Sequence, residues 1–332
     1  MLTTASTAAL KDHRAKTSAP VWQRLADAGA ICIAKSNMPE VAAALNGYNP
    51  LHGHCWNAHG IGFSSGGSSS GTAAGIAAGM APCGLGSDTA GSLRIPADRN
   101  GITGLRPSLG RYPGEGCVPL IARVDTPGPM GLTCADVALI DHFMSGEPAV
   151  APAPQLVPAD LSGLKVCTPS AWIGANLSPG SHAALDLAVA ALEGAGATVG
   201  DDKAGFAAFT EKLEEKTSFF EGRNTTMKAM DAYLARDESG ITTADVCKQL
   251  HWSNALLGFV YQSEGAREIA GMSEEDYQTK YGEPHKAAKE ELEAAYLAFL
   301  DDTNVEFMLT PCNNCAPENW AKVRPNTQYL SC

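Results

Sequence analysis

Basic residues are scarce in this chain. Its 332 residues include 24 lysines and arginines against 36 aspartates and glutamates, which gives a formal net charge of −12 at pH 7. Nucleic acids and anionic membranes attract proteins through clustered positive charge, and the sequence contains no basic patch with interleaved aromatic residues. The composition therefore argues against a nucleic-acid partner and against binding to an anionic membrane surface.

Long apolar runs are missing as well. No stretch of eighteen apolar residues is present that could cross a bilayer. The N-terminus lacks the basic segment and apolar core of a secretory signal, and the ten cysteines do not have the spacing of a disulfide framework. These absences predict a cytoplasmic protein with reduced thiols and no membrane partner.

Patterns that would bind a metal are weak. The segment 52–59 holds three histidines and one cysteine, which are ligand types for zinc or copper, but we interpret them as ordinary loop residues. Cys312 and Cys315 form a lone C-x-x-C without a second pair, and we interpret them as two free thiols. The sequence predicts neither a metal nor another cofactor.

What the chain does contain is glycine, alanine and a regular alternation of helix and strand patterns. Charged residues make up 18% of the chain and hydrophobic residues 45%, which suits one large packed α/β domain. The alternation predicts helices layered around a central sheet. The expected helices are 19–29, 71–80, 181–193, 206–236 and 285–300, and the expected strands are 30–34, 83–86, 164–167, one following 195–199, and 305–309. The run at 30–34 is apolar without alternation, which is typical of a strand buried on both faces. The run at 305–309 is also expected to be a buried strand.

The most informative stretch contains two serines inside glycine runs. Ser68 lies in Gly66-Gly67-Ser68-Ser69-Ser70-Gly71, and Ser92 lies in Gly86-Ser87-Asp88-Thr89-Ala90-Gly91-Ser92-Leu93-Arg94. Glycine allows unusual backbone dihedrals and close approach to a ligand. A serine in such a loop is a candidate nucleophile whose neighbouring N–H groups can face a developing oxyanion.

These residues resemble the signature of the amidase signature family. The resemblance extends over Ser65–Gly110 as GGSSSG, GSDTAGSLRIPA and GLRPSLGR. It implies a central mixed sheet flanked by helices on both faces, and amide cleavage by a Ser–cis-Ser–Lys triad. Ser92 matches the nucleophile and Ser68 the cis-serine, while Asp88 and Arg94 match supporting positions. The oxyanion would be bound by the backbone N–H groups of Thr89, Ala90, Gly91 and Ser92.

The family's catalytic lysine has no counterpart in the sequence. It would precede a Thr-Thr-Ala stretch that resembles Thr3-Thr4-Ala5, and would therefore fall before Met1. The family also continues beyond a Thr-Pro like Thr310-Pro311, so the chain is expected to be truncated at both ends and the fold incomplete. We expect a single domain over 1–332, with a catalytic block at 1–146, a proline-rich connection at 147–160 and a second half at 161–332.

Lys35 is not a substitute for that lysine by motif. It lies in Ala34-Lys35-Ser36-Asn37-Met38, which resembles a different segment of the family. Lys11, Lys16 and Lys35 are the lysines upstream of Ser68, and we interpret each as a solvated charge or a local ion pair. Without a base, the serine pair has no acceptor for its proton, so this chain is expected to be inactive or impaired.

Three alternatives bear on the site. A flexible Gly/Ser linker would not run into an Ala/Ile/Met helix pattern. Gly62-Phe63-Ser64-Ser65-Gly66 matches the G-x-S-x-G nucleophile elbow, but the residues before it make a poor strand. The third alternative is a serine hydrolase in which His59 serves as the base.

The segments 105–113 and 123–130 look most like the mandelamide and indoleacetamide hydrolase branch of the family. That likeness implies a small aryl-acetamide substrate. A homodimer is compatible with the sequence, and the main functional alternative is a non-catalytic relic that keeps the fold and a ligand pocket.

Overall fold

The computed structural model describes residues 1–146, 160–170, 173, 177–201, 203–216, 225–237, 239–251, 261 and 263–312. They fall into two compact units: unit 1 within Met1–Leu156 and Gly222–Gly271, and unit 2 within Val157–Glu221 and Met272–Ala316. The expected proline-rich connection lies, apart from Asp160, outside the described residues. The single-domain organisation stays a prediction.

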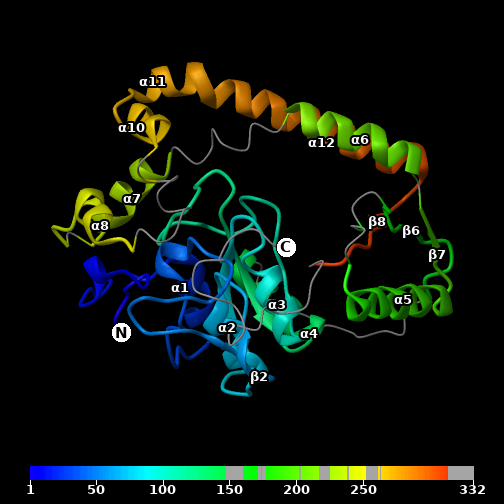
Figure 1. Cartoon of the computed structure of the whole chain (residues 1–332), viewed down its shortest axis with the longest axis horizontal. Helices are drawn as coiled ribbons and strands as arrows, with labels where there is room; N and C mark the ends of the chain where they lie inside the picture. The colour runs from blue at the N-terminus through cyan, green and yellow to red at the C-terminus, as the bar shows by residue number, and fades with distance from the viewer. Residues whose placement is uncertain are drawn as a thin grey trace. The chain divides into compact units, whose positions relative to one another are not determined.

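Unit 1 combines short strands with helices (Figure 1). Its strands are β1 (Trp56–Asn57), β2 (Gly60–Ser64), β3 (Cys83–Asp88), β4 (Thr103–Gly104) and β5 (Thr126–Gly131). Its helices are η1 (Ala8–Leu10), α1 (Pro20–Asp27), η2 (Glu40–Ala42), α2 (Ser70–Ala77), α3 (Arg94–Asn100), α4 (Cys134–Ser145), α7 (Thr226–Ala235), α8 (Thr243–Gln249) and α10 (Glu264–Ala270).

The strands β3, β5 and β4 form an antiparallel sheet in that order. Pro127 and Pro129 of the middle strand lie opposite Ser87 and Leu85 of β3. Proline has no N–H to donate, and the backbone groups of Ser87 and Leu85 bond to side chains of the α2 region instead. The register thus places two prolines in a central strand, and hydroxyls of the α2 region bond to the carbonyl oxygen of Leu85 and to both backbone groups of Ser87.

Helices cover both faces of this sheet. Met130 of β5 packs with Ile76 of α2 and Ala97 of α3, whereas Leu85 of β3 packs with Val21 of α1 and residues of α4. Gly84 is paired with Met130, so these two residues share a face and Leu85 points to the other. A Cβ at Gly84 would approach Thr72 Cγ2 to 2.7 Å, which shows how closely α2 lies on the strand.

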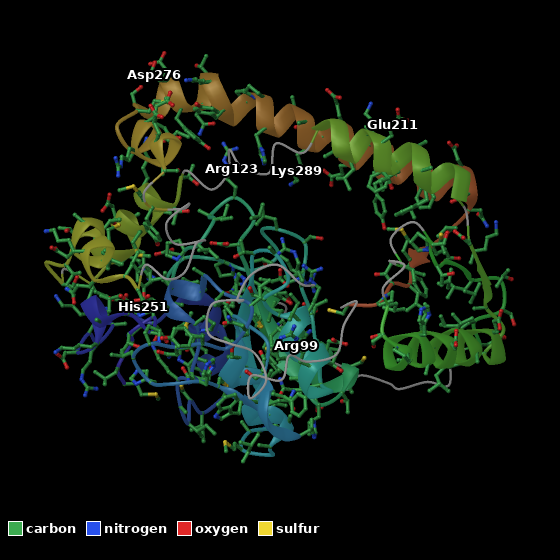
Figure 2. The ribbon with its side chains drawn as sticks, in the orientation of Figure 1. Arg99, Arg123, Glu211, His251, Asp276 and Lys289 are labelled. Carbon is green, nitrogen blue, oxygen red and sulfur yellow. The ribbon has the colours of Figure 1, made fainter. Side chains whose placement is uncertain are left out.

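Unit 2 has the parallel β7-β6-β8 sheet. Its elements are β6 (Lys165–Cys167), α5 (Pro179–Gly194), β7 (Thr198–Gly200), α6 (Lys203–Lys216), α11 (Glu274–Tyr277), the π-helical η4 (Gln278–Gly282), α12 (Glu283–Thr303) and β8 (Phe307–Met308). Its core contains Cys167, Phe206 and Phe299. Glu211 of α6 is exposed (Figure 2). Both units alternate helix and strand, which confirms the α/β class.

Most expected elements are present. Helices α1, α2, α5 and α12 and strands β3, β6, β7 and β8 confirm the predictions for their segments. The predicted helix at 206–236 is seen as α6 in unit 2 and α7 in unit 1, and the residues joining them lie outside the described part of the chain. No helix in the described ranges is long and apolar enough to cross a bilayer.

Two predictions about strands are wrong. Residues 30–34 form no strand, and Ile31 and Ile33 are 85% and 66% exposed. The run has the composition of a buried strand, but β3 pairs on one side only, with β5, and no described strand pairs with 30–34. The strand predicted at 305–309 is present as β8 but is not buried as expected, since Phe307 is 38% exposed.

Candidate active site

The two serine loops meet in unit 1. Strand β3 leads into the loop that carries Ser92, and helix α3 follows it directly. The peptide bond between Gly67 and Ser68 is cis, and the next residue, Ser69, donates its backbone N–H to the carbonyl oxygen of Ser92 at 3.2 Å. Ser68 and Ser92 are both buried. The fold therefore brings together the two serines singled out from the sequence.

The hydroxyls of the two serines are not hydrogen-bonded to each other. Among the described residues, the hydrogen bonds between the loops join Ser69 N–H to the carbonyl oxygen of Ser92 and Ser69 Oγ to the backbone of Ser87. The nucleophile and relay roles of Ser92 and Ser68 therefore stay predictions.

The amides that follow β3 differ in their availability. The N–H of Gly91 donates to Asp88 Oδ1 at 2.7 Å, so this amide is already used. The amides of Thr89, Ala90 and Ser92 make no hydrogen bond to another described residue. Three of the four predicted oxyanion donors are thus available here, and the expected contribution of Gly91 is not seen in this arrangement.

Asp88 is the centre of a buried ionic network. Its carboxylate is fully buried and accepts hydrogen bonds from Arg94 Nε at 3.1 Å, Arg106 Nη1 at 2.9 Å and the N–H groups of Gly91 and Leu93. Burial alone would raise the pKa of this carboxyl, but the bonds from Arg94 and Gly91 outweigh it and hold the pKa below its ordinary value. An ionised Asp88 therefore fixes the loop on both sides of Ser92.

Asp125 supports the same loop from outside. Its carboxylate accepts from Thr89 Oγ1 at 2.6 Å and from the N–H groups of Leu120 and Ile121 at 2.8 and 2.9 Å. Burial raises the pKa of Asp125 despite these bonds. Arg106 joins the two carboxylate clusters, because it also donates to the carbonyl oxygen of Val124.

Replacing Thr89 by valine is expected to lower the free energy of unfolding by about 1–3 kcal/mol, because a buried carboxylate loses one of its donors. Urea unfolding measures the change. Thr89→Ser keeps the hydroxyl and serves as the matched control. Equal stability of the two variants would show that the Thr89–Asp125 bond contributes nothing.

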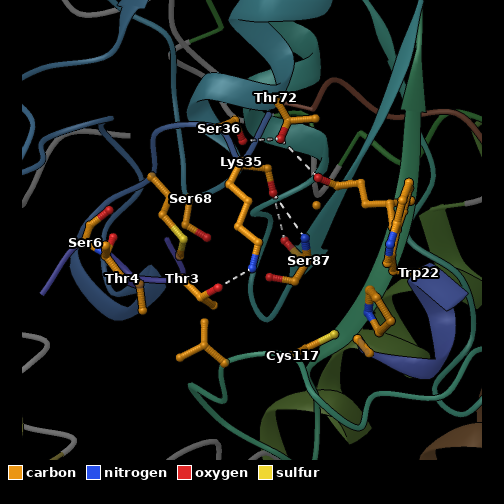
Figure 3. Close-up of a pocket in the computed structure, with 18 of the residues that line it drawn as sticks. Thr3, Thr4, Ser6, Trp22, Lys35, Ser36, Ser68, Thr72, Ser87 and Cys117 are labelled. Atoms are coloured by element: carbon orange, nitrogen blue, oxygen red, sulfur yellow. Dashed lines mark hydrogen bonds between the residues drawn. The ribbon is translucent and has the colours of Figure 1, made fainter. Parts of the chain in front are cut away.

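A cavity of about 600 Å³ opens beside Ser68 (Figure 3). Its lining includes Thr3, Trp22, Lys35, Ser68, Ser69, Ser87, Cys117, Val118 and Tyr233, but not Ser92. Lys35 points into this pocket, and its Nζ donates to Thr3 Oγ1 at 2.6 Å. Lys35 is exposed, in keeping with the predicted solvated charge, and its hydrogen-bond partner is a hydroxyl on the pocket wall.

His59 lies at the wrong end of α3 to act as a base for Ser92. Its Nε2 is 2.8 Å from the carbonyl oxygen of Asn100, the last residue of the helix. Ser92 precedes the first residue of the helix, and seven helical residues span about 10 Å. The reading that uses His59 as the base is thus overturned.

Two other motifs find structural roles. The residues before the G-x-S-x-G motif are a poor strand, as predicted, because 58–59 form the turn between β1 and β2. Ser64 ends β2, and its buried hydroxyl donates to the carbonyl oxygen of Asn46. A buried hydroxyl that donates to a backbone carbonyl oxygen is not placed to act as a nucleophile. In the segment 52–59, His54 stacks on Trp56 at 4.9 Å, and no group of three metal-ligand side chains occurs among the residues described. Cys315 lies outside them.

Several residues of the site were missed in the sequence. Asp125, Arg106, Ser69 and Thr72 each act through partners far along the chain. Asp125 and Arg106 lie within segments noted only for their likeness to one branch of hydrolases. No local pattern distinguishes such residues, because their roles depend on which loops the fold brings together.

Comparison with known proteins matches the sequence model of the Amidase family to residues 1–332. An indoleacetamide hydrolase of Rhizobium radiobacter is 32% identical over 59% of this chain and 41% of its own length. A mandelamide hydrolase of Pseudomonas putida is 39% identical over 46% of the chain and 32% of its own length. The chain thus aligns with less than half the length of these curated relatives.

Solved structures of similar fold include a crystal structure of an amidase, with a TM-score of 0.70, 25% identity, and coverage of 96% of this chain and 65% of the other. The native peptide amidase of Stenotrophomonas maltophilia has a TM-score of 0.70 at 22% identity, covering 96% and 70% of the two chains. The latter likeness concerns the fold alone.

Proposed function

The chain belongs to the amidase family, and from that membership we propose that it cleaves a carboxamide C–N bond through a seryl acyl-enzyme. The observation that carries the proposal is the meeting of the two serine loops, where Ser69 N–H bonds to Ser92 O beside three amides that bond to no described residue. A serine nucleophile requires a nearby base and oxyanion donors. Ser92 stands next to such donors, and Ser68 is on the adjoining loop.

In the proposed reaction, Ser92 Oγ forms a bond to the amide carbonyl carbon. Its proton passes to Ser68 and then to the departing nitrogen, the C–N bond breaks, and ammonia or an amine leaves. Water then attacks the acyl carbon and releases the acid with Ser92 restored. The amides of Thr89, Ala90 and Ser92 would hold the oxyanion, and removing one such donor typically lowers a rate by about 10²–10³.

The substrate class we propose is a small aryl-acetamide. Support comes from the relatives named for indoleacetamide and mandelamide hydrolysis. The pocket beside Ser68 is lined by Trp22 and Tyr233 together with apolar side chains. Such a lining favours binding of an aromatic group.

We also propose that this 332-residue chain turns over slowly. The triad lysine of the family has no matching position in the sequence, and a serine hydroxyl without a base is a weak nucleophile. The second candidate function, a non-catalytic relic with a ligand pocket, is favoured by one observation: Ser92 does not line the pocket.

The experiment follows ammonia release from phenylacetamide. We expect Ser92-dependent turnover far below the ordinary enzyme range of about 1–10³ per second. Ser92→Ala should remove it, whereas Ser64→Ala, which leaves both proposed reacting hydroxyls in place, should not. Turnover at ordinary rates would contradict the impairment.

Acyl transfer is tested separately with p-nitrophenyl phenylacetate and intact-mass spectrometry. An activated ester needs less help from a base, so the wild-type chain should gain one phenylacetyl group and release p-nitrophenol. Ser92→Ala should gain none. If the wild-type chain acquires no acyl group at Ser92, the proposed reaction is refuted and the alternative of a non-catalytic relic is supported.

A further inference from the structure

The pocket beside Ser68 is lined by a lysine, Lys35, that forms no ion pair with a described residue, although the charge of Asp237 acts on it from a distance. Lys35 Nζ donates to Thr3 Oγ1 at 2.6 Å, and this is the hydrogen bond that the structure gives the ammonium within the described residues. An ammonium carries three donors, so two remain available. Although Lys35 as a residue is exposed, desolvation by the surrounding protein lowers the pKa of its amine, as expected when no carboxylate is paired with it.

The described lining supplies no anion to this cation. It contains neither aspartate nor glutamate. Burial raises the pKa of the Cys117 thiol to about 11 and that of the Tyr233 phenol to about 12, so both groups are neutral at neutral pH. The nearby Asp237 is bonded to His13 Nε2 at 3.1 Å and to the N–H of Lys16 at 2.9 Å.

The rest of the lining is suited to an apolar body. Trp22, Leu85, Val118 and Tyr233 form apolar and aromatic walls, and Ser68 contributes a hydroxyl. The cavity volume of about 600 Å³ is typical of small-molecule sites, in which a few polar groups orient a largely apolar ligand. Figure 3 shows Lys35 and Ser68 among the residues that line this pocket.

We propose that this pocket binds an ionised monocarboxylate with an aromatic body, held by Lys35. The choice of an arylacetate rests on the proposed function, because it is the acid that hydrolysis of an aryl-acetamide releases. The carboxylate would take the two available N–H donors of Lys35, and the ring would lie against Trp22 and Tyr233. A neutral amide of the same shape lacks the charge and should bind more weakly.

The test is calorimetric titration of phenylacetate and phenylacetamide into the Ser92→Ala chain, in which no amide can be consumed. Phenylacetate should bind the more tightly. Lys35→Met should weaken phenylacetate binding about ten- to hundred-fold, the usual effect of losing a hydrogen bond to a charged group. Lys35→Arg should retain binding, and circular dichroism checks that each variant is folded.

Lys11→Met is the matched control. It removes a charge from the same N-terminal region but from a residue that does not line the pocket, and it should leave phenylacetate affinity unchanged. In a pH series on the parent chain, binding should fall as pH rises through the lowered pKa of Lys35, while phenylacetate stays ionised throughout.

Equal affinity for acid and amide, or equal effects of Lys35→Met and Lys11→Met, would overturn the proposal. Acylation of Ser92 in the parent chain is measured independently of this binding. A chain that is acylated but does not prefer phenylacetate refutes the Lys35 pocket alone, and a chain that binds phenylacetate but is never acylated refutes the proposed reaction alone.

Discussion

Replacing Asp88 by alanine is expected to lower the free energy of unfolding by about 3–5 kcal/mol, the usual cost of removing one partner of a buried ion pair. The carboxylate is fully buried and accepts from two arginines and two backbone amides. Its loss leaves the Gly91 and Leu93 amides without their acceptor. Because these amides flank Ser92, acylation by p-nitrophenyl phenylacetate should fall as well.

The control for Asp88→Ala is Asp12→Ala. Asp12 is 88% exposed and lies 3.9 Å from Lys11, and exposed pairs of this kind contribute about 0–1 kcal/mol. Urea unfolding of the three chains separates the two cases. An Asp88→Ala chain as stable as Asp12→Ala would show that the network is not needed for folding.

The same network predicts an acid sensitivity with a definite sign. The pKa of Asp88 is lower in the folded chain than in an unfolded one, so its contribution is fully present above the unfolded pKa of about 4. That contribution is lost as pH falls towards the folded pKa. Wild-type stability should therefore decline below about pH 4, and the decline should be smaller in Asp88→Ala.

The second large effect is expected for Gly71→Ala in α2. A Cβ at this position would lie 2.5 Å from the backbone nitrogen of Asn37 and 2.6 Å from its oxygen. Backbone cannot move aside as a flexible side chain can, and the Gly71 N–H bonds to this same oxygen at 2.8 Å. Overpacking of this kind costs about 1–3 kcal/mol. The displaced segment also carries Lys35, so phenylacetate binding should weaken.

Gly75 provides the comparison within the same helix. Nothing lies within 4 Å of a Cβ built there, and alanine favours a helix over glycine by about 0.5–1 kcal/mol. Gly75→Ala should therefore stabilise the chain while Gly71→Ala destabilises it. Thermal or urea unfolding decides between them, and a shift of the same sign in both would contradict the close approach of Asn37.

The sequence was sufficient to predict elements whose pattern is local. Helix α5 follows a run of apolar residues at helical spacing and ends near Gly194, and β3 follows from its position between a small-residue helix and the Ser92 loop. The structure of the apolar run at 30–34 cannot be predicted in this way, because a pattern of side chains shows that a strand could be buried but not whether another strand lies beside it.

The features of the site likewise divide into those that the sequence predicts and those that depend on the fold. The positions of Ser68 and Ser92 on touching loops, and the supporting position of Asp88, could be predicted from glycine-rich motifs and a family resemblance. The contact of Thr89 with Asp125 joins residues 36 positions apart, and that of Lys35 with Thr3 joins residues 32 apart. Such contacts depend on loop paths that no short pattern specifies.

The side chains that bond to β3 have a consequence for self-association. β3 is at an edge of its three-stranded sheet, and exposed edges invite pairing with other chains and the growth of aggregates. Thr72 Oγ1 donates to the carbonyl oxygen of Leu85 at 3.0 Å, and Ser69 Oγ contacts both the N–H and the carbonyl oxygen of Ser87. Two hydroxyls of the neighbouring helix region thus occupy three of the backbone groups that an added strand would need, and this hinders pairing of another chain with the edge.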